Sequence, residues 1–509
     1  MAQAFLRALS PFLATYRRGQ SCLRQAGISS DGVRLSYHHQ TKQMNLSNLI
    51  NLAYLAASVL FIVGLKRLTS PRTARRGNGT ASLAMLIAVC ATLLDHHIVS
   101  YQWILLGIAL GSLIGAVAAI KVPLTAMPEL VAMFNGFGGG ASALVAATAV
   151  LSPETLTRVP PAQLYIASAV SAIVGAATLT GSLVAWAKLL EVLRVQPLGK
   201  LVRLAGMASL LACIALGVRL VIVPEVGWVL WSLLGAASLY GVLLTVPVGG
   251  ADMPVVIALL NSCSGLAAAA TGFVLGNNVL IISGSLVGAS GFILTRIMCR
   301  AMNRSLTDVL AGNLGEGAAT VSRGDDIYHG RVKSSSPDEA AMILETSRIV
   351  TIVPGYGMAV AHAQHDVRKF AALLQDRGVE VRYGIHPVAG RMPGHMNVLL
   401  AEADVPYDEL YDMEQINPTF SETDVVLVVG ANDVVNPAAR DEPQSPIYGM
   451  PILEVDKART VMIVKRSLSP GFAGIPNKLF VAPNSLMLFG DGKQVMRELV
   501  IAVDELGHP

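Results

Sequence analysis

Nine mostly apolar runs, each near the length needed to cross a bilayer, fill roughly the first three hundred residues of the chain. A helix needs roughly 20 such residues to span the hydrocarbon core. The runs lie at about 46–65, 81–95, 101–120, 129–151, 163–187, 203–223, 226–247, 252–275 and 279–300. With 53% hydrophobic and 14% charged residues among 509, the chain is predicted to contain an α-helical membrane bundle of about nine transmembrane helices. The second run is short.

The fourth run is rich in glycine, with Gly136, Gly138, Gly139 and Gly140 close together. In a membrane, residues without bulky side chains let helix backbones approach closely. Close helix packing is therefore expected along this run.

Positive charges in the loops predict the orientation of the bundle. One alternate set of loops carries Lys66, Arg67, Lys121, Lys188 and Arg300 among other cations, whereas the opposite set offers little beyond Arg158. Because cytoplasmic loops are enriched in Lys and Arg, the C-terminal part is expected in the cytoplasm and Met44 on the far side.

Residues 1–45 form an N-terminal extension with several arginines and serines and a single acid, Asp31. This is the composition of a transit peptide, but Met44 begins a natural first membrane helix. The interpretation as a mis-called start is favoured, and a presequence is the alternative. A chain beginning at Met44 is expected to insert and function like the full chain.

Charged residues become common after about Arg304, where a second kind of domain is predicted. Residues 304–335 have linker composition, and Ser336-Pro-Asp-Glu339 is a capping box that begins a helix. Strands are expected at about 349–353, 379–385, 396–401, 424–429, 460–465 and 479–482, with a helix containing Val367, Phe370, Ala371 and Leu374 between the first two. Apolar strands that alternate with helices predict an α/β Rossmann-like domain with a parallel sheet at 336–509, after a transmembrane domain at 46–303.

The strand at 349–353 runs into a turn that contains Gly355 and Gly357 and opens a helix. Such a turn presents backbone N–H groups to a dinucleotide pyrophosphate. A short Gly-x-Gly is also common where a strand and a helix merely pack tightly, so both interpretations stay open.

The ends of two strands bear on which dinucleotide would bind. NAD-binding units usually end the second strand with Asp or Glu for the ribose hydroxyls, whereas here the second strand is followed by His386 and Pro387. The fifth strand ends in Lys465-Arg466-Ser467, which suits a 2′-phosphate through charge-assisted bonds. NADP(H) is therefore favoured over NAD(H), although a Lys-Arg pair is often only a solvated surface.

Other features exclude several classes of function. A net charge of +4, with no basic patch interleaved with aromatics, gives no sign of nucleic-acid binding. The five cysteines are scattered, without C-x-x-C spacing, so neither a disulfide framework nor a metal site is indicated.

Several segments of the chain are similar to one known family. They are Gly249-Gly-Ala-Asp252-Met-Pro-Val-Val, Asn261-Ser, Met298-Cys-Arg-Ala-Met-Asn303-Arg-Ser, Pro354-Gly-Tyr-Gly-Met-Ala-Val-Ala361, Gly384-Ile-His-Pro-Val-Ala-Gly-Arg391-Met-Pro-Gly-His-Met-Asn397, Gly430-Ala-Asn-Asp433 and Lys465-Arg-Ser467. Over essentially all of residues 46–509 the chain resembles the β subunit of the proton-translocating NAD(P) transhydrogenase.

The resemblance implies an NADP(H) site made by residues of the C-terminal domain. They are Gly355, Tyr356, Gly357, Val360, Val388, Ala389, Gly390, Arg391, Met392, Pro393, Gly430, Ala431, Asn432, Asp433, Val434, Gly449, Met450, Lys465, Arg466, Ser467, Gly471, Phe472, Asp491 and Gly492. Arg391 is expected near the phosphates. Family members usually carry tyrosine at the position of Phe472.

The resemblance also implies polar groups that couple the reaction to proton movement, which are costly in lipid unless they face the bundle interior. Those carried over are Ser182, Asp252 and Asn261. Many relatives have histidine at the position of Asn135, whose amide does not titrate. We therefore expect either that His96 or His97 titrates, or that water ordered by Asn135, Ser182 and Asn261 carries the proton to Asp252 or Asp433.

The alternatives are structural. His96 and His97 would be a solvated loop pair, Ser182 and Asn261 would join helices by hydrogen bonds, and Asp252 would be a helix cap. Each alternative stays open from the sequence alone.

The function implied is hydride transfer from NADH to NADP+ coupled to inward proton movement. NAD(H) would be bound by a separate α subunit, and a dimer of αβ units is expected. The location would be the bacterial inner membrane, with the mitochondrial inner membrane as the alternative. A rival function is a transporter gated by a nucleotide-sensing Rossmann domain, but the internal repeats common in transporters are not found in the sequence.

Overall fold

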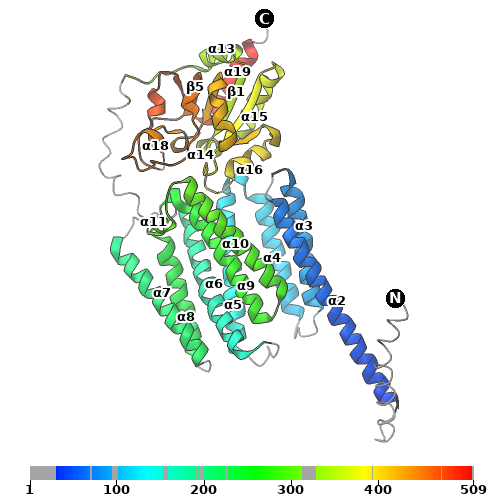
Figure 1. Cartoon of the computed structure of the whole chain (residues 1–509). Helices are drawn as coiled ribbons and strands as arrows, with labels where there is room; N and C mark the ends of the chain where they lie inside the picture. Colours follow the sequence, from blue (N-terminus) through cyan, green and yellow to red (C-terminus); the bar gives the residue numbers. More distant parts are fainter. Residues whose placement is uncertain are drawn as a thin grey trace, which may run out of the picture. The chain divides into compact units, whose positions relative to one another are not determined.

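The computed structural model describes residues 30–68, 71–94, 101–152, 159–190, 192–193, 199–223, 227–311, 328, 330–392, 394–471 and 473–506. Its chain divides into two compact units, Met1–Leu106 and Gly107–Pro509. Figure 1 gives the element labels used below.

Two long helices pack together in the first unit, α2 (Ser30–Leu68) and α3 (Pro71–Leu93). A side chain on Gly77 would lie 2.9 Å from the carbonyl oxygen of Gly64, so glycine at this crossing permits the contact. A third helix, α4 (Tyr101–Lys121), begins in the first unit and continues into the second.

The second unit contains six further long helices. They are α5 (Met127–Leu151), α6 (Pro161–Leu189), α7 (Gly199–Ile222), α8 (Gly227–Thr245), α9 (Met253–Leu275) and α10 (Asn278–Ala301). Helix α6 packs against α5, α8 and α9, and α9 packs against α10 (Figure 1). Gly139 of α5 and Gly175 of α6 touch, since a side chain on Gly139 would lie 2.7 Å from the Gly175 carbonyl oxygen. The close packing expected from the glycine-rich run is thus confirmed at Gly139.

Within the described residues, each of the nine predicted spans lies largely in a helix, and eight of these helices are long and apolar enough to cross a membrane. The run at 81–95 lies in α3, which is not among the eight. Helix α3 begins with Arg72, Arg75 and Arg76 near its first turns, so its apolar part is shorter than a full span. The fold class, a membrane bundle followed by an α/β domain, is confirmed.

The α/β domain contains six parallel strands. They are β1 (Ile349–Pro354), β2 (Glu380–Ile385), β3 (Leu410–Asp412), β4 (Val425–Val429), β5 (Thr460–Lys465) and β6 (Ser485–Phe489). Their order in the sheet is β3-β2-β1-β4-β5-β6, with Ile352 paired to Tyr383 on one side and to Leu427 on the other. This is the strand order of the Rossmann fold, in which the chain reverses its direction of winding between β1 and β4.

Helices surround this sheet. They are α13 (Pro337–Glu345), α14 (Tyr356–Val360), α15 (Gln364–Asp376), α16 (His395–Glu402), α17 (Met413–Ile416), α18 (Ala438–Asp441) and α19 (Gly492–Leu506). The capping box that begins α13 is present, with the Ser336 hydroxyl accepting from the Glu339 amide.

Two strand predictions are wrong. Residues 396–401 lie in helix α16, because Met396, Leu399 and Leu400 are buried at helical spacing. Residues 479–482 lie mostly in a 3-10 helix, η9 (Lys478–Val481), and the last strand follows at β6. The short strand β3 was not predicted.

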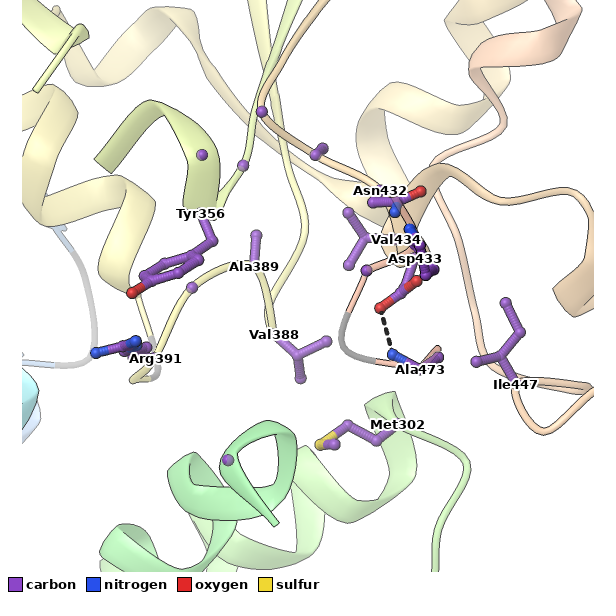
Figure 2. A pocket seen from close by; sticks show the side chains of 18 of the residues that line it. Met302, Tyr356, Val388, Ala389, Arg391, Asn432, Asp433, Val434, Ile447 and Ala473 are labelled. Carbon is purple, nitrogen blue, oxygen red and sulfur yellow. Dashed lines mark hydrogen bonds between the residues drawn. The ribbon is translucent and has the colours of Figure 1, made fainter. Parts of the chain in front are cut away.

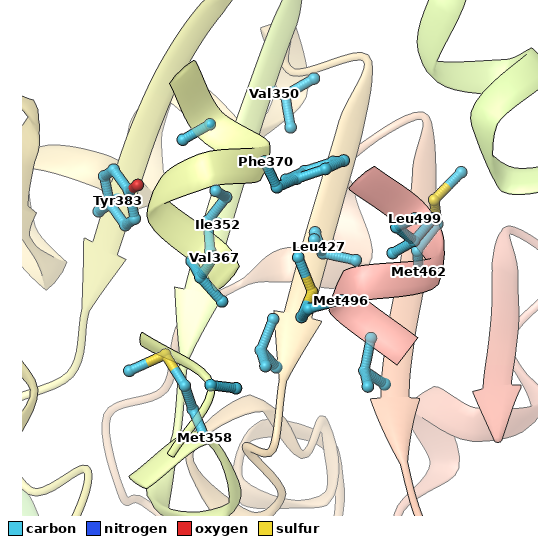
Figure 3. Close-up of a cluster of buried hydrophobic side chains, with 14 of the residues drawn as sticks. Val350, Ile352, Met358, Val367, Phe370, Tyr383, Leu427, Met462, Met496 and Leu499 are labelled. Atoms are coloured by element: carbon cyan, nitrogen blue, oxygen red, sulfur yellow. The ribbon is translucent and has the colours of Figure 1, made fainter. Parts of the chain in front are cut away.

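The sheet is buried on both faces, as its unbroken apolar strands predict. All five residues of β4 are buried. Figure 3 displays one face, where Ile352 and Leu427 lie near Phe370 of α15 and Met496 of α19, and all four belong to one buried cluster. The predicted helical residues Val367, Phe370, Ala371 and Leu374 are all buried on α15.

The structure describes several residues of the segment between the last membrane helix and α13. It contains a short helix, α11 (Leu306–Ala311), and Ser334 forms a β-bridge with Met487 of β6. Tyr328 stacks on Phe480 with ring centroids 6.1 Å apart, and its hydroxyl accepts from the Asn477 amide at 2.7 Å. These contacts attach the end of the predicted linker to the sheet domain.

Candidate functional site

A cavity of about 930 Å³ lies at the carboxyl ends of β1, β4 and β5. This is the edge at which open α/β sheets bind ligands, beside the point where the winding reverses. Figure 2 shows Tyr356, Val388, Ala389 and Asp433 around it, with Met302 of the α10 segment on another side. The lining therefore combines loops of the sheet domain with the end of a membrane helix.

Two glycine-containing turns, one after β1 and one after β4, contact each other at the cavity. The Gly355 amide donates to the Val429 carbonyl at 2.9 Å, and the Gly357 amide donates to the Gly430 carbonyl at 2.8 Å. A side chain on Gly355 would lie 2.4 Å from the Ala431 Cα, and Gly430 has a left-handed φ of +69°. Glycine is thus required here by the close contact of the β1 and β4 turns. Both turns line the cavity.

The end of β5 places a cation at the cavity. Lys465 donates to the Ser469 carbonyl and lies 4.6 Å from the centroid of the Phe480 ring. Burial lowers the pKa of Lys465 to about 8, an effect that the nearby Asp433 carboxylate opposes. The Arg466 guanidinium is exposed and pairs with Asp491 at 2.9 Å.

The Asp433 carboxylate joins two loops at the cavity. It accepts from the Ala473 amide at 3.0 Å (Figure 2). A side chain on Gly471 would lie 2.6 Å from its Oδ1 atom. The loop after β4 and the loop after β5 are therefore held together at Asp433.

Two buried histidines hold the loop that follows β2. Nδ1 of His386 accepts from the Val388 amide at 3.3 Å, so Nε2 carries the proton and donates to the Pro451 carbonyl at 2.8 Å. Nδ1 of His395 accepts from the Arg391 amide at 3.1 Å. Burial lowers the pKa of each imidazole to about 4, and for His395 the positive charge of Arg391 adds to the effect. Both rings are therefore neutral at pH 7.

The membrane side of the cavity contains a buried ion pair. Asp252, the last residue of the 3-10 helix η3 (Gly250–Asp252), is 1% exposed. Its two carboxylate oxygens accept from NH1 of Arg304 at 2.8 and 2.7 Å. Asp252 occupies the N-cap position of α9, but its side chain makes no capping hydrogen bond there.

The predicted coupling residues within the bundle lie on three helices that pack together. Asn135 of α5 donates to the Ile257 carbonyl of α9 at 3.4 Å, and Asn261 lies one turn further along α9. Ser182 of α6 is fully buried, and a side chain on Gly136 would lie 3.1 Å from its Cβ. Its hydroxyl has no hydrogen-bond partner among the described residues.

Most of the site predicted from the sequence lines the cavity. The lining includes Gly355, Tyr356, Gly357, Val360, Val388, Ala389, Gly390, Arg391, Gly430, Ala431, Asn432, Asp433, Val434, Met450, Lys465, Arg466, Ser467, Gly471 and Gly492. Three predicted residues are not in the lining: Met392, Gly449 and Asp491. Pro393, Phe472, His96 and His97 are outside the part of the chain that the structure describes.

Sequence reasoning gave no site role to several lining residues. Among them are Met302, Asn303, Arg304, Ile447 and Ala473. Asn303 has a left-handed φ of +48° and donates to the Tyr448 carbonyl at 2.6 Å. The signal for Asn303 and Arg304 was the segment Met298–Ser305, which carries the family resemblance.

The fold and the cavity define a class, a multi-pass membrane protein with a Rossmann-type domain whose carboxyl-edge cavity is partly lined by its membrane helices. The family model described as NAD(P) transhydrogenase beta subunit matches residues 50–502. The chain belongs to this family, and its general function is that of a transhydrogenase β subunit.

Individual relatives agree with this assignment. Two curated sequences named NAD(P) transhydrogenase subunit beta, both from Rhodospirillum rubrum, are each 48% identical to the chain over 456 residues. The match covers 89% of this chain and 98% of each relative.

Proposed function

We propose that this chain binds NADP(H) in the cavity at the carboxyl edge of its sheet and takes part in hydride transfer coupled to proton translocation. The observation that carries the proposal is the position of Lys465. It is a partly buried cation at the end of β5, in a cavity that Asp252 and Arg304 also line. A site lined by both the sheet domain and the membrane helices is suited to linking nucleotide chemistry to events in the membrane.

The residues of the cavity suit NADP(H). A volume of about 930 Å³ lies within the usual range for cofactor sites. The Lys465 ammonium suits a phosphate, whereas the strand β2 ends without a carboxylate for the ribose hydroxyls. The neighbouring strand β3 does have a carboxylate, Asp412, which is paired with Ile385. Its side chain, however, is used in the capping box that begins α17.

Hydride passes directly between two nicotinamide rings, so the protein need only hold the two rings against each other and exclude water from between them. Gly355 and Gly430 keep the turns after β1 and β4 in close contact at the cavity. Lys465 and Arg391 are assigned to the phosphates. Asp433 holds the loop at Ala473, and the neutral His386 and His395 fix the loop that carries Val388 and Arg391.

The remaining parts of the proposal concern the whole assembly. NAD(H) is assigned to a partner α subunit, without which this chain is inactive, and the assembly is proposed to be a dimer of αβ units. Residues 46–303 are assigned to proton translocation and 336–509 to NADP(H) binding. The location is proposed as the bacterial inner membrane, with the 336–509 domain in the cytoplasm.

The test is an assay of the full chain, purified with its α subunit and placed in sealed vesicles that contain a pH-sensitive dye. NADPH-dependent reduction of an NAD+ analogue should be accompanied by acidification or alkalinisation of the vesicle interior. An uncoupler should abolish the pH change and leave hydride transfer intact. Nucleotide binding that gates an ion flux without hydride transfer would favour the transporter instead.

A further inference from the structure

The Arg391 side chain connects the loop after β2 to two membrane helices. Its NH1 atom donates to the Leu189 carbonyl at the end of α6 at 2.9 Å and to Oε1 of Glu129 in the first turn of α5 at 3.4 Å. The guanidinium also lies 4.7 Å from the centroid of the Tyr356 ring. In Figure 2 it lies beside Tyr356 and points away from Val388. Both hydrogens of NH1 are therefore directed at the membrane helices.

The two helices that Arg391 contacts are the ones that carry Asn135 and Ser182. Asn135 lies six residues after Glu129 on α5, and Ser182 lies seven residues before Leu189 on α6. The end of α6 is itself fixed, because the Lys188 ammonium donates to carbonyls at the end of α8, including that of Val248 at 2.7 Å. A displacement of Arg391 would thus change its contacts with the start of α5 and the end of α6, and the end of α6 is also bonded to α8 through Lys188.

Glu129 depends on this contact. It is 8% exposed, and its Oε2 atom has no hydrogen-bond partner among the described residues. A buried carboxylate needs a cation or hydrogen-bond donors, since water does not solvate it. Arg391 is the cation within ion-pair distance of Glu129 in the described part of the chain.

A phosphate and the Glu129 carboxylate would compete for Arg391. Both anions suit the guanidinium fork, and each repels the other when they share one cation. A two-pronged contact with a phosphate that uses NH1 and NH2 would take NH1 from Glu129 and the Leu189 carbonyl. Nucleotide binding and the Glu129 contact therefore oppose each other.

We propose that Glu129 is a positioning residue that competes with the phosphates of the bound nucleotide for Arg391, so that occupancy of the nucleotide site is transmitted to α5 and α6. This rests on the proposed function, in which the cavity binds NADP(H). Reciprocity follows from linkage: if Glu129 weakens nucleotide binding, then nucleotide binding weakens the hold of Arg391 on α5.

The test compares Glu129→Gln with the wild-type chain, each assembled with its α subunit. The amide keeps the shape of the side chain and removes its charge. The dissociation constant of NADPH should fall about tenfold, as expected for a coupling of ordinary size. Proton-coupled transhydrogenation should slow because product leaves late, while the cyclic reaction between bound NADP(H) and NAD(H), which needs no net proton transfer, continues. Glu422→Gln makes the same charge change on an exposed residue of the sheet domain and should alter none of these quantities.

A double-mutant cycle separates a specific contact from general destabilisation. In an Arg391→Met background, Glu129→Gln should no longer tighten NADPH, because the shared cation is gone. If Glu129→Gln does not assemble, Glu129→Asp lengthens the contact and should tighten NADPH to a smaller extent.

Unchanged NADPH affinity in both Glu129 variants would overturn the inference, as would an equal tightening in the Arg391→Met background. Failure of the wild-type assembly to bind NADPH would instead refute the proposed function.

Discussion

Lys465 lies at the end of β5, where burial lowers its pKa to about 8. At the residue scale, the charge of this lysine decides how the site responds to a 2′-phosphate. The phosphate is largely a dianion above pH 6, so the lysine is the group that changes charge at higher pH.

Replacement of Lys465 by alanine should weaken NADPH binding far more than NADH binding, because NADH lacks the 2′-phosphate. Titration calorimetry on the purified complex measures both affinities. An equal loss for the two nucleotides would contradict the assignment.

The affinity of the wild-type complex for NADPH should also fall as the pH rises from 7 to 9, because Lys465 loses its proton through this range. Lys465→Arg keeps its charge at all these values and should flatten the profile. A fall of the same size in Lys465→Arg would place the titrating group elsewhere.

The two histidines of the loop after β2 give a prediction at acid pH. Their folded pKa of about 4 lies below the ordinary value of 6.5, so their contribution to stability is complete above pH 6.5 and is lost as the pH falls towards 4. A difference of this size corresponds to about 3 kcal/mol for each ring.

When the loop opens, its rings regain the ordinary pKa and take up a proton below pH 6.5, and a protonated nitrogen has no lone pair to accept from the Val388 or Arg391 amide. Hydrogen-exchange protection of these two amides, corrected for the intrinsic pH dependence, should therefore fall between pH 6.5 and 4. The Ile352 amide in the centre of the sheet serves as the control. Constant protection at Val388 and Arg391 would contradict the proposed acceptor role of the rings.

At the scale of elements, glycine sets the distance between α5 and α6. Gly139 of α5 faces Gly175 of α6, whereas a side chain on Gly138 would have Ser264 as its nearest neighbour at 4.0 Å. Adjacent glycines of one helix thus have different surroundings.

Gly139→Ala should force the two helices apart and destabilise the bundle by about 1–3 kcal/mol, the usual cost of overpacking. Gly138→Ala is the matched control and should leave stability unchanged or raise it slightly, since alanine favours the helix. Thermal unfolding of both variants in the same detergent measures the difference. Equal melting temperatures would mean that the α5–α6 contact adjusts freely.

At the scale of the whole molecule, proton coupling requires a titrating group, and the amide of Asn135 cannot serve. In the described structure Asn135 donates to a carbonyl of α9 and Asp252 is paired with Arg304. We hypothesise that His96 or His97 takes up the proton that is translocated, since the ordinary pKa of histidine is suitable.

The double change His96→Ala with His97→Ala should abolish proton-coupled reverse transhydrogenation and leave the cyclic reaction largely intact. Dye-monitored vesicles measure the first and a spectrophotometric assay the second. Undiminished proton pumping in the double variant would eliminate the histidines and favour the path through Asn135, Ser182 and Asn261 to an aspartate.

The sequence alone determined the architecture, because the period and length of apolar runs report directly on the solvent that each segment meets. The membrane spans, the capping box at Ser336 and the buried strands β1, β2, β4 and β5 followed from local pattern. The glycine turn after β1 and the Lys465-Arg466-Ser467 end of β5 did so as well, whereas the other residues assigned to the nucleotide site came from the family resemblance.

Only the tertiary structure decided which distant groups meet. The apolar run at 396–401 suits a strand or a helix by composition, and its packing as α16 settled the matter. The pairs Asp252–Arg304 and Glu129–Arg391 join residues 52 and 262 positions apart. Such contacts leave no periodic trace in the sequence, because they depend on how helices and strands pack after each has formed.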